Sequence, residues 1–152
     1  MTVMSPTASG QYFGQSLYNY ASTFSWGSDG TPDSNVSTNQ DLTIFKQSGG
    51  TTSAGDGFEF TVPATTTTRT LVIYVGIKQQ GTAVLTASLN DGIAAPYTDT
   101  SISLNNNSVL DGVYTIQYRS PTPGETLTVT WTVQSDAGSP AHLRIAGATL
   151  SG

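Results

Sequence analysis

The acid–base groups of this chain are few, and their spacing favours binding over catalysis. Ten carboxylates and one histidine, His142, are available. Acid–base hydrolysis needs two carboxylates that converge on one bond. Half of the eight Asp residues stand beside Gly, a sequence typical of turns, where Asp is favoured because its side chain bonds to the backbone. Nothing in the spacing of Glu59 and Glu125 pairs them, so we predict no catalytic residues.

His142 offers no alternative route to catalysis. It alternates with Leu143 and Ile145, which places it on the opposite, solvent-facing side of a strand. A triad would need it beside a nucleophilic Ser and an Asp, and the sequence has no Gly-x-Ser-x-Gly elbow. One His and no Cys also leave an ordinary zinc site without ligands. We therefore predict that the chain is not an enzyme.

Aromatic side chains outside the core are the best candidates for a binding site. A sugar stacks its apolar face on a ring while nearby polar groups orient its hydroxyls. Tyr18 and Tyr20 alternate in a polar stretch, so their rings would share one side of a strand. Trp26 stands at a strand end, and Tyr97 follows a Pro in a loop. We predict that these four residues bind carbohydrate; the alternative for each Tyr is a partly buried edge position, and for Trp26 the core.

Calcium is the one ion that the loops could hold, because it takes six to eight oxygen ligands from carboxylates and carbonyls. Asp29 and Asp33 stand in one polar turn whose backbone carbonyls could complete such a site. Their spacing does not match an EF-hand. We predict no required cofactor, with a structural calcium at Asp29 and Asp33 as the open possibility.

The charge content of the chain limits the classes of partner that it could bind. Charged residues make up 10% of the chain and the net charge is −5, against about a quarter charged in typical soluble domains. The five basic residues are spread along the sequence and do not form the clustered basic patch that binds phosphate groups. We therefore expect no nucleic-acid partner and no binding to anionic membranes. No run of 18 apolar residues is present, so we expect no transmembrane helix.

The length of 152 residues fits one domain, 1–152. Whether residues 1–20 form an extension or a first strand stays open. Residues 1–10 are polar and lack the charged and apolar regions of a signal peptide. The Thr- and Ser-rich, weakly charged composition suits a module that works outside the cell. We expect an extracellular domain cut from a longer protein; a protein that begins here in the cytoplasm is the alternative.

Alternation of apolar and polar residues dominates, and helical periodicity is absent. In the clearest strand, Leu127, Val129, Trp131 and Val133 share one face and Thr residues the other. A second strand, 70–78, is apolar on both faces, which predicts a central position covered on both sides. Strands recur every 10–15 residues between turns, which predicts an all-β, antiparallel β-sandwich of eight to nine strands, jelly-roll or Ig-like. We predict a tight hairpin at Gln80–Gly81.

Several segments resemble a loosely characterised β-sandwich accessory module of secreted bacterial polysaccharide-active and surface proteins, often found beside glycoside hydrolase or fibronectin-like domains. The segments are Gly57–Ala64, Thr68–Leu71, Tyr74–Gly76, Leu85–Asp91, Tyr97–Thr100, Gly112–Thr115 and Leu127–Trp131, and Phe24–Trp26 with Asp29–Pro32 also fits. The resemblance implies a β-sandwich that occurs as an accessory domain beside other domains. By association with such proteins, it also implies a role like that of a carbohydrate-binding module. It brings no ligand residues with it, and a fold by itself carries no function.

These observations support two main hypotheses. The first is a non-catalytic carbohydrate-binding module that targets a secreted bacterial protein or glycoside hydrolase, its parent in cis, to a polysaccharide. The second is a structural or adhesive domain of an extracellular surface protein, fibre or coat; a flat, exposed apolar edge strand would favour it. An enzyme stays as a third, because pairing of carboxylates distant in sequence is invisible here.

Overall fold

A computed structural model describes residues 1–4, 11–16, 41–46, 52–136 and 141–152 of the chain. These residues form eleven strands, eight of which have six or more residues. No helix able to cross a membrane occurs among them. The strands are β1 (Thr2–Met4), β2 (Gln11–Ser16), β3 (Asp41–Lys46), β4 (Gly57–Pro63), β5 (Arg69–Lys78), β6 (Gly81–Leu89), β7 (Tyr97–Asp99), β8 (Ser103–Leu104), β9 (Val109–Tyr118), β10 (Thr126–Asp136) and β11 (His142–Ser151).

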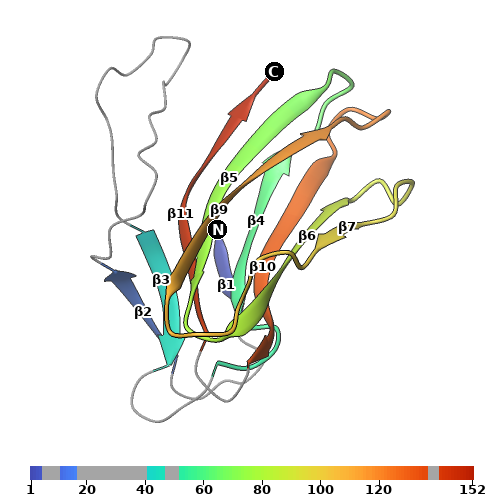
Figure 1. The fold of residues 1–152 in the computed structure, drawn as a ribbon. Helices are drawn as coiled ribbons and strands as arrows, with labels where there is room; N and C mark the ends of the chain where they lie inside the picture. The colour runs from blue at the N-terminus through green and yellow to red at the C-terminus, as the bar shows by residue number, and fades with distance from the viewer. Residues whose placement is uncertain (5–10, 17–40, 47–51, 137–140) are drawn as a thin grey trace.

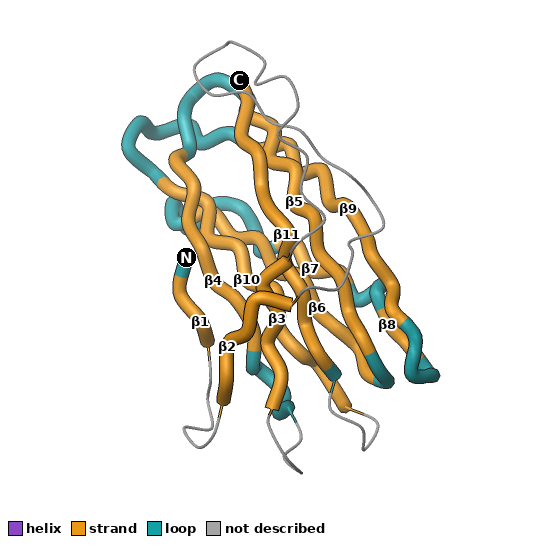
Figure 2. Tube along the Cα trace, turned by 90° about the vertical axis from the view of Figure 1, so that its left-hand side faces the viewer, coloured by secondary structure: helices purple, strands orange, loops and turns teal. Residues whose placement is uncertain are grey.

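The strands form two antiparallel sheets that face each other (Figures 1 and 2). One sheet has the order β1-β4-β10-β6-β7, with β8 also on β6, and the other has the order β2-β3-β11-β5-β9. The all-β sandwich prediction is confirmed. Between the two alternatives that the sequence left open, the strand order matches a jelly roll: β3-β11-β5-β9 faces β4-β10-β6-β7. Strands β1 and β2 extend the two sheets at one side.

The core lies between the inner faces of the sheets. On β10, the predicted apolar face is buried, and Trp131 is 0% exposed. Its cross-strand neighbours are Phe58 on β4 and Leu85 on β6, both fully buried. Burial of one aromatic side chain removes roughly 150–250 Å² from water, which stabilises the fold by about 4–6 kcal/mol. The opposite sheet contributes Leu71, Ile73, Val75 and Ile77 from β5, all buried.

The predicted hairpin at Gln80–Gly81 is wrong. Strands β5 and β6 are joined by two residues but belong to different sheets: β5 pairs with β11 and β9, whereas β6 pairs with β10, β7 and β8. The connection is a sharp crossover, in which Gln79 has a φ of 68°. The alternation of apolar residues is the same on both sides of a hairpin and of a crossover, so the sequence pattern does not separate them.

The outer face of the β5 sheet carries a buried ion pair. Arg144 on β11 and Asp111 on β9 both lie opposite Gly76 on β5, one on each side. Because Gly76 has no side chain, the Arg144 guanidinium reaches across it and donates to Asp111 Oδ1 at 2.8 Å. Arg144 is 0% exposed, so this part of the outer face is not open to solvent. The prediction that β5 is covered on both sides holds here.

His142 shares this outer face, where the sequence predicted exposure. It is half-buried instead, and burial, followed by the charge of Lys78, lowers its pKa. The expectation that His142 faces solvent is therefore wrong. The environment of one face of a strand can change along its length, and His142 lies at a half-buried end of this face.

We predict that Gly76→Ala lowers the free energy of unfolding by about 1–3 kcal/mol. An added Cβ would lie 2.5 Å from Asp111 Oδ1 and 3.1 Å from the carbonyl oxygen of Leu110. The short Asp side chain has to move and the ion pair is disturbed. Gly112→Ala is the control, because its Cβ would meet the flexible tip of Ile102 and should cost less. Urea denaturation measures both; equal losses would contradict the explanation.

Candidate functional site

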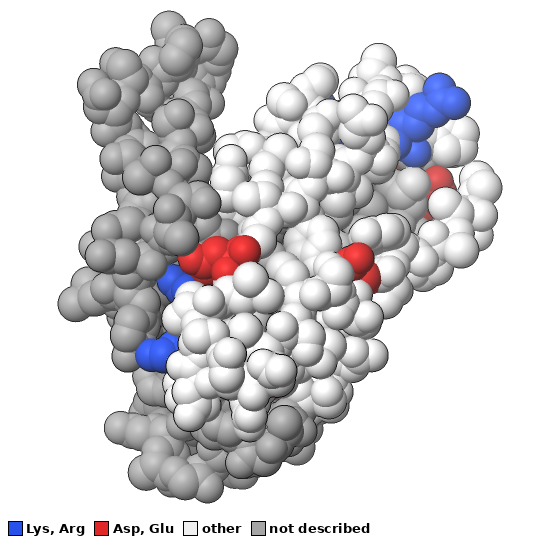
Figure 3. Space-filling model, viewed as in Figure 1, with Lys and Arg blue, Asp and Glu red and all other residues white. Residues whose placement is uncertain are grey.

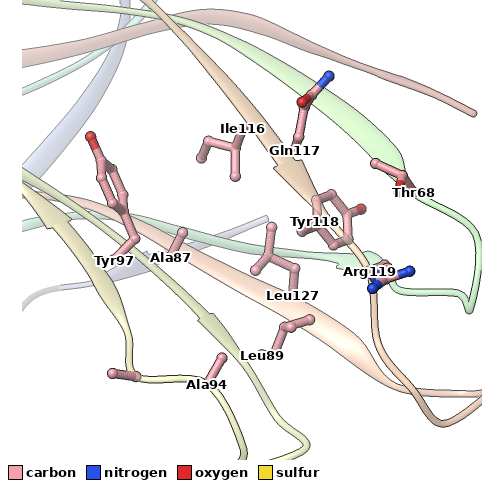
Figure 4. Close-up of a pocket in the computed structure, with 11 residues that line it drawn as sticks. Thr68, Ala87, Leu89, Ala94, Tyr97, Ile116, Gln117, Tyr118, Arg119 and Leu127 are labelled. Carbon is pink, nitrogen blue, oxygen red and sulfur yellow. The ribbon is translucent and has the colours of Figure 1, made fainter.

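A pocket of about 440 Å³ opens at one edge of the sandwich, between the end of β9 and strands β6 and β7 of the facing sheet (Figure 4). Ligand pockets in proteins run from about 300 to 1,000 Å³, so the volume suits a small ligand. The lining comes from both sheets and from the loop after β6: Thr68, Ala87, Leu89, Ala94, Ala95, Tyr97, Ile116, Gln117, Tyr118, Arg119 and Leu127.

The hollow exists because one edge strand is short and its neighbours are small. Strand β7 pairs with β6 over Leu85–Ala87 only, whereas β9 runs on to Tyr118. Past the Ala87–Tyr97 pair, β6 therefore has no edge strand beside it among the described residues. Ala87, Ala94 and Ala95 fill little of the remaining space, and the pocket keeps an apolar wall.

Two tyrosines give the pocket its aromatic surface. Tyr97 is 51% exposed and lies at one end of the lining residues in the close-up (Figure 4). Tyr118 is 7% exposed, and its hydroxyl donates to the carbonyl oxygen of Pro63 at 3.0 Å. Burial raises the pKa of Tyr118, and the charge of Arg69 opposes that shift. One ring is therefore held rigidly, and the other is accessible to a ligand.

The polar rim consists of Thr68, Gln117 and Arg119, all exposed. In the part of the chain that the structure describes, Arg119 makes no hydrogen bond or ion pair. Tyr97 and Arg119 lie at opposite ends of the lining residues in the close-up (Figure 4). An apolar wall, an accessible ring and free donors at the rim form an arrangement that could hold a sugar residue.

A hydrogen-bonded cluster around Asp99 joins the two sheets beside the pocket. Asp99 ends β7, and its Oδ1 accepts bonds from the Ser101 amide at 2.9 Å and from the Tyr114 hydroxyl of β9 at 2.7 Å. The Tyr97 hydroxyl lies 3.5 Å from Oδ2. The bonds from Ser101 and then from Tyr114 lower the pKa of Asp99. Tyr114 also packs edge-on against Trp131, with ring centroids 6.0 Å apart.

The cluster fixes the spacing of the two edge strands where the pocket begins. Desolvation, and then the bond to Asp99, raise the pKa of Tyr114 far above its usual value. Tyr114 therefore stays a neutral donor over the physiological range. Asp99 is a structural carboxylate in this arrangement, and no acidic side chain is among the residues that line the pocket. The pair of carboxylates that acid–base hydrolysis requires is therefore missing from this lining.

The sequence-predicted site residues fall into two groups. Tyr97 lines the pocket. Tyr18, Tyr20, Trp26, Asp29 and Asp33 lie outside the described residues. Carbohydrate binding by the first three and calcium binding by the two Asp residues therefore stay predictions. Sequence reasoning missed Gln117 and Arg119. The only sequence feature that points to these two residues is their alternation with Tyr118, which places them on the polar side of a strand end.

Two other features of the described residues do not offer a comparable ligand site. A second hollow of about 260 Å³ is lined by Met1, Phe60, Ile145, Ala146, Gly147 and Ala148. No polar side chain is among its lining residues, so it offers a sugar nothing to bond. Within the described ranges, no three His, Cys, Asp or Glu side chains gather as a metal site would require.

No family model matches the chain, and no curated protein matches it. Its fold is similar to solved structures at low identity. TmCBM61 in complex with β-1,4-galactotriose is 8% identical, with a TM-score of 0.47 over 94% of this chain and 88% of that one. An arabinose-bound α-L-arabinofuranosidase, MgGH51, is 16% identical, with a TM-score of 0.43 over 99% of this chain and 24% of the enzyme.

A third similar structure is the CBM35 from Cellvibrio japonicus Abf62, which is 13% identical, with a TM-score of 0.36 over 93% of this chain and 96% of that one. With identities and TM-scores this low, the three likenesses carry no argument about function. The fold and the site described above rest on the residues of this chain.

We predict that Tyr114→Phe lowers the free energy of unfolding by about 1 kcal/mol, because it removes a partly exposed bond to an ionised carboxylate and keeps the ring on Trp131. The pKa of Tyr114 is raised in the folded state from an ordinary 10.0. As the pH rises past about 10, the unfolded chain therefore loses this proton first, and stability falls. The variant should show a shallower fall than the wild type.

Urea denaturation at pH 7 and at pH 10.5 measures both effects. Tyr97→Phe serves as the control, because it removes a hydroxyl that makes only a 3.5 Å contact with the same carboxylate and should cost less. Equal stability of wild type and Tyr114→Phe at both pH values would contradict the role given to this bond.

Proposed function

We propose that this chain is a non-catalytic carbohydrate-binding module that holds an extracellular bacterial protein on a polysaccharide. The observation that carries the proposal is the half-exposed Tyr97 at the mouth of an apolar-walled pocket with exposed Gln117 and Arg119 at its rim. A ring that offers its face, next to unoccupied donors, matches the requirements of a sugar residue. No chemistry is needed, since tethering by itself raises the local concentration of the polymer around a parent enzyme in cis.

The first test is a screen of the purified chain against soluble and insoluble polysaccharides by affinity gel and pull-down. We predict that Tyr97→Ala weakens binding to the retained polymer roughly tenfold, about 1.4 kcal/mol. Tyr97→Phe should bind nearly as well as the wild type, because the ring and not the hydroxyl makes the stacking contact.

Val113→Ala is the matched control, because Val113 is also 51% exposed and is not among the pocket residues. Full binding by Tyr97→Ala with an unchanged Tm would overturn the assignment of this pocket. Failure of the folded chain to bind any polymer would overturn the function itself.

The calcium hypothesis can be tested on the same purified chain. We propose that Asp29 and Asp33 hold a structural ion, which requires oxygen ligands from carboxylates and carbonyls. Addition of a chelator should then lower the Tm, and calcium should restore it. An unchanged Tm in excess chelator would dismiss the ion while leaving the pocket and its function intact.

One observation favours the structural or adhesive alternative. Among the described strands, β9 pairs with β5 alone, as the last strand of its sheet. It exposes Val109, Leu110 and Val113, at 42%, 37% and 51%. An exposed apolar edge strand can pair with another chain. Sedimentation of the chain over a hundredfold range of concentration tests this alternative. Self-association that is lost in Val113→Lys would support the adhesive function. A monomer at every concentration would contradict self-association through this edge.

A further inference from the structure

The pocket carries an unbalanced positive charge. Arg119 is the one charged side chain among its eleven lining residues. Arg119 is exposed, and no described residue forms a hydrogen bond or an ion pair with it. The visible described surface is mostly neither acidic nor basic, and its blue and red side chains are few and scattered (Figure 3).

Two acidic residues that flank the pocket-lining segment 94–97 in sequence are engaged elsewhere. Asp91, in the loop that supplies Ala94 and Ala95, accepts from the Ile93 amide at 3.0 Å and from the Ser120 hydroxyl at 3.3 Å. Asp99 accepts from Ser101 and Tyr114. Neither carboxylate pairs with Arg119, although the chain has twice as many acidic as basic residues. The guanidinium is therefore left available for a ligand.

The other arginines of the described sheets are paired. Arg144 is buried against Asp111 at 2.8 Å. Arg69 donates from Nε to the Thr65 hydroxyl at 3.3 Å and is not among the pocket residues. Among the three arginines, Arg119 is therefore the one that lines the pocket and whose N–H donors have no partner among the described residues.

A guanidinium recognises a carboxylate better than it recognises a sugar hydroxyl. Its planar N–H groups match the two oxygens of a carboxylate in a bidentate pair, which is shorter and stronger than a bond between neutral groups. We propose, resting on the carbohydrate-binding function proposed above, that this pocket binds acidic polysaccharide, with a uronic acid carboxylate on Arg119 and a sugar face on Tyr97.

The net charge of −5 opposes a polyanion at long range, but it does not decide the outcome. At physiological ionic strength the Debye length is about 8 Å, so charges spread over the rest of the surface are largely screened at the pocket. The direct contact with Arg119 is screened far less. The expected signature is therefore a local one: selectivity that depends on one residue and weakens as salt rises.

The test compares polymers that share a backbone and differ in charge. Polygalacturonate and its methyl ester form one pair, and glucuronoxylan and unsubstituted xylan form another. We expect the wild type to bind the carboxylated member at least tenfold more tightly at 50 mM NaCl, with a smaller ratio at 500 mM. Arg119→Gln should bring the ratio close to one while keeping the binding that Tyr97 provides, and Arg119→Lys should give an intermediate ratio.

Arg69→Gln is the matched control, because it changes the net charge equally at the same end of the molecule and should keep the ratio within about twofold. Equal binding of both members, lost in Tyr97→Ala, would overturn acidic selectivity and leave the proposed function standing. Selectivity that survives Arg119→Gln, or a preference for sulfated over carboxylated polymers, would overturn the inference. Absence of binding to every polymer by folded protein would overturn both proposals.

Discussion

Burial of Trp131 between the two sheets is the interaction on which the rest of this structure depends. Its ring lies at the centre of the row formed with Phe58 and Leu85, and Tyr114 of the opposite sheet packs edge-on against it. That contact places the Tyr114 hydroxyl beside Asp99, which ties β9 to β7. The tie lies at Asp99, the last residue of β7, and the pocket opens past Tyr97, where β7 begins. Core packing thus decides where the cleft can form.

Arg144 and Arg119 show how the same residue type serves two purposes. Arg144 spans a glycine to reach Asp111 and is removed from solvent. Breaking such a buried pair is costly, because one charge would be left without compensation. Arg119 stands at an open rim, where an unpaired charge is hydrated and costs little. Only the second arrangement leaves donors that a ligand can use, which is why we place recognition at Arg119.

The fold could be predicted from the sequence because burial imposes a period of two on each strand. The inner faces of β10 and β5 follow that pattern, with Leu127, Val129, Trp131 and Val133 buried on β10 and Leu71, Ile73, Val75 and Ile77 on β5. The pattern tells which side chains share a face, but it does not tell which sheet a strand joins. It therefore predicts a hairpin where the structure has a crossover at Gln79. The pocket could be predicted only through Tyr97. Its other parts come together because β6, β9 and the start of β5 meet at one edge, and such contacts leave no local signal.

The central claim is that the cleft between β9 and the β6–β7 edge is the ligand site. An NMR titration with a short oligosaccharide from the retained polymer tests it most directly, through the amide signals of the folded chain. The account predicts that saturable shift changes concentrate on Ala87, Leu89, Tyr97 and residues 116–119. Changes concentrated on β3 and β11, with the signals of the cleft residues unmoved, would contradict it.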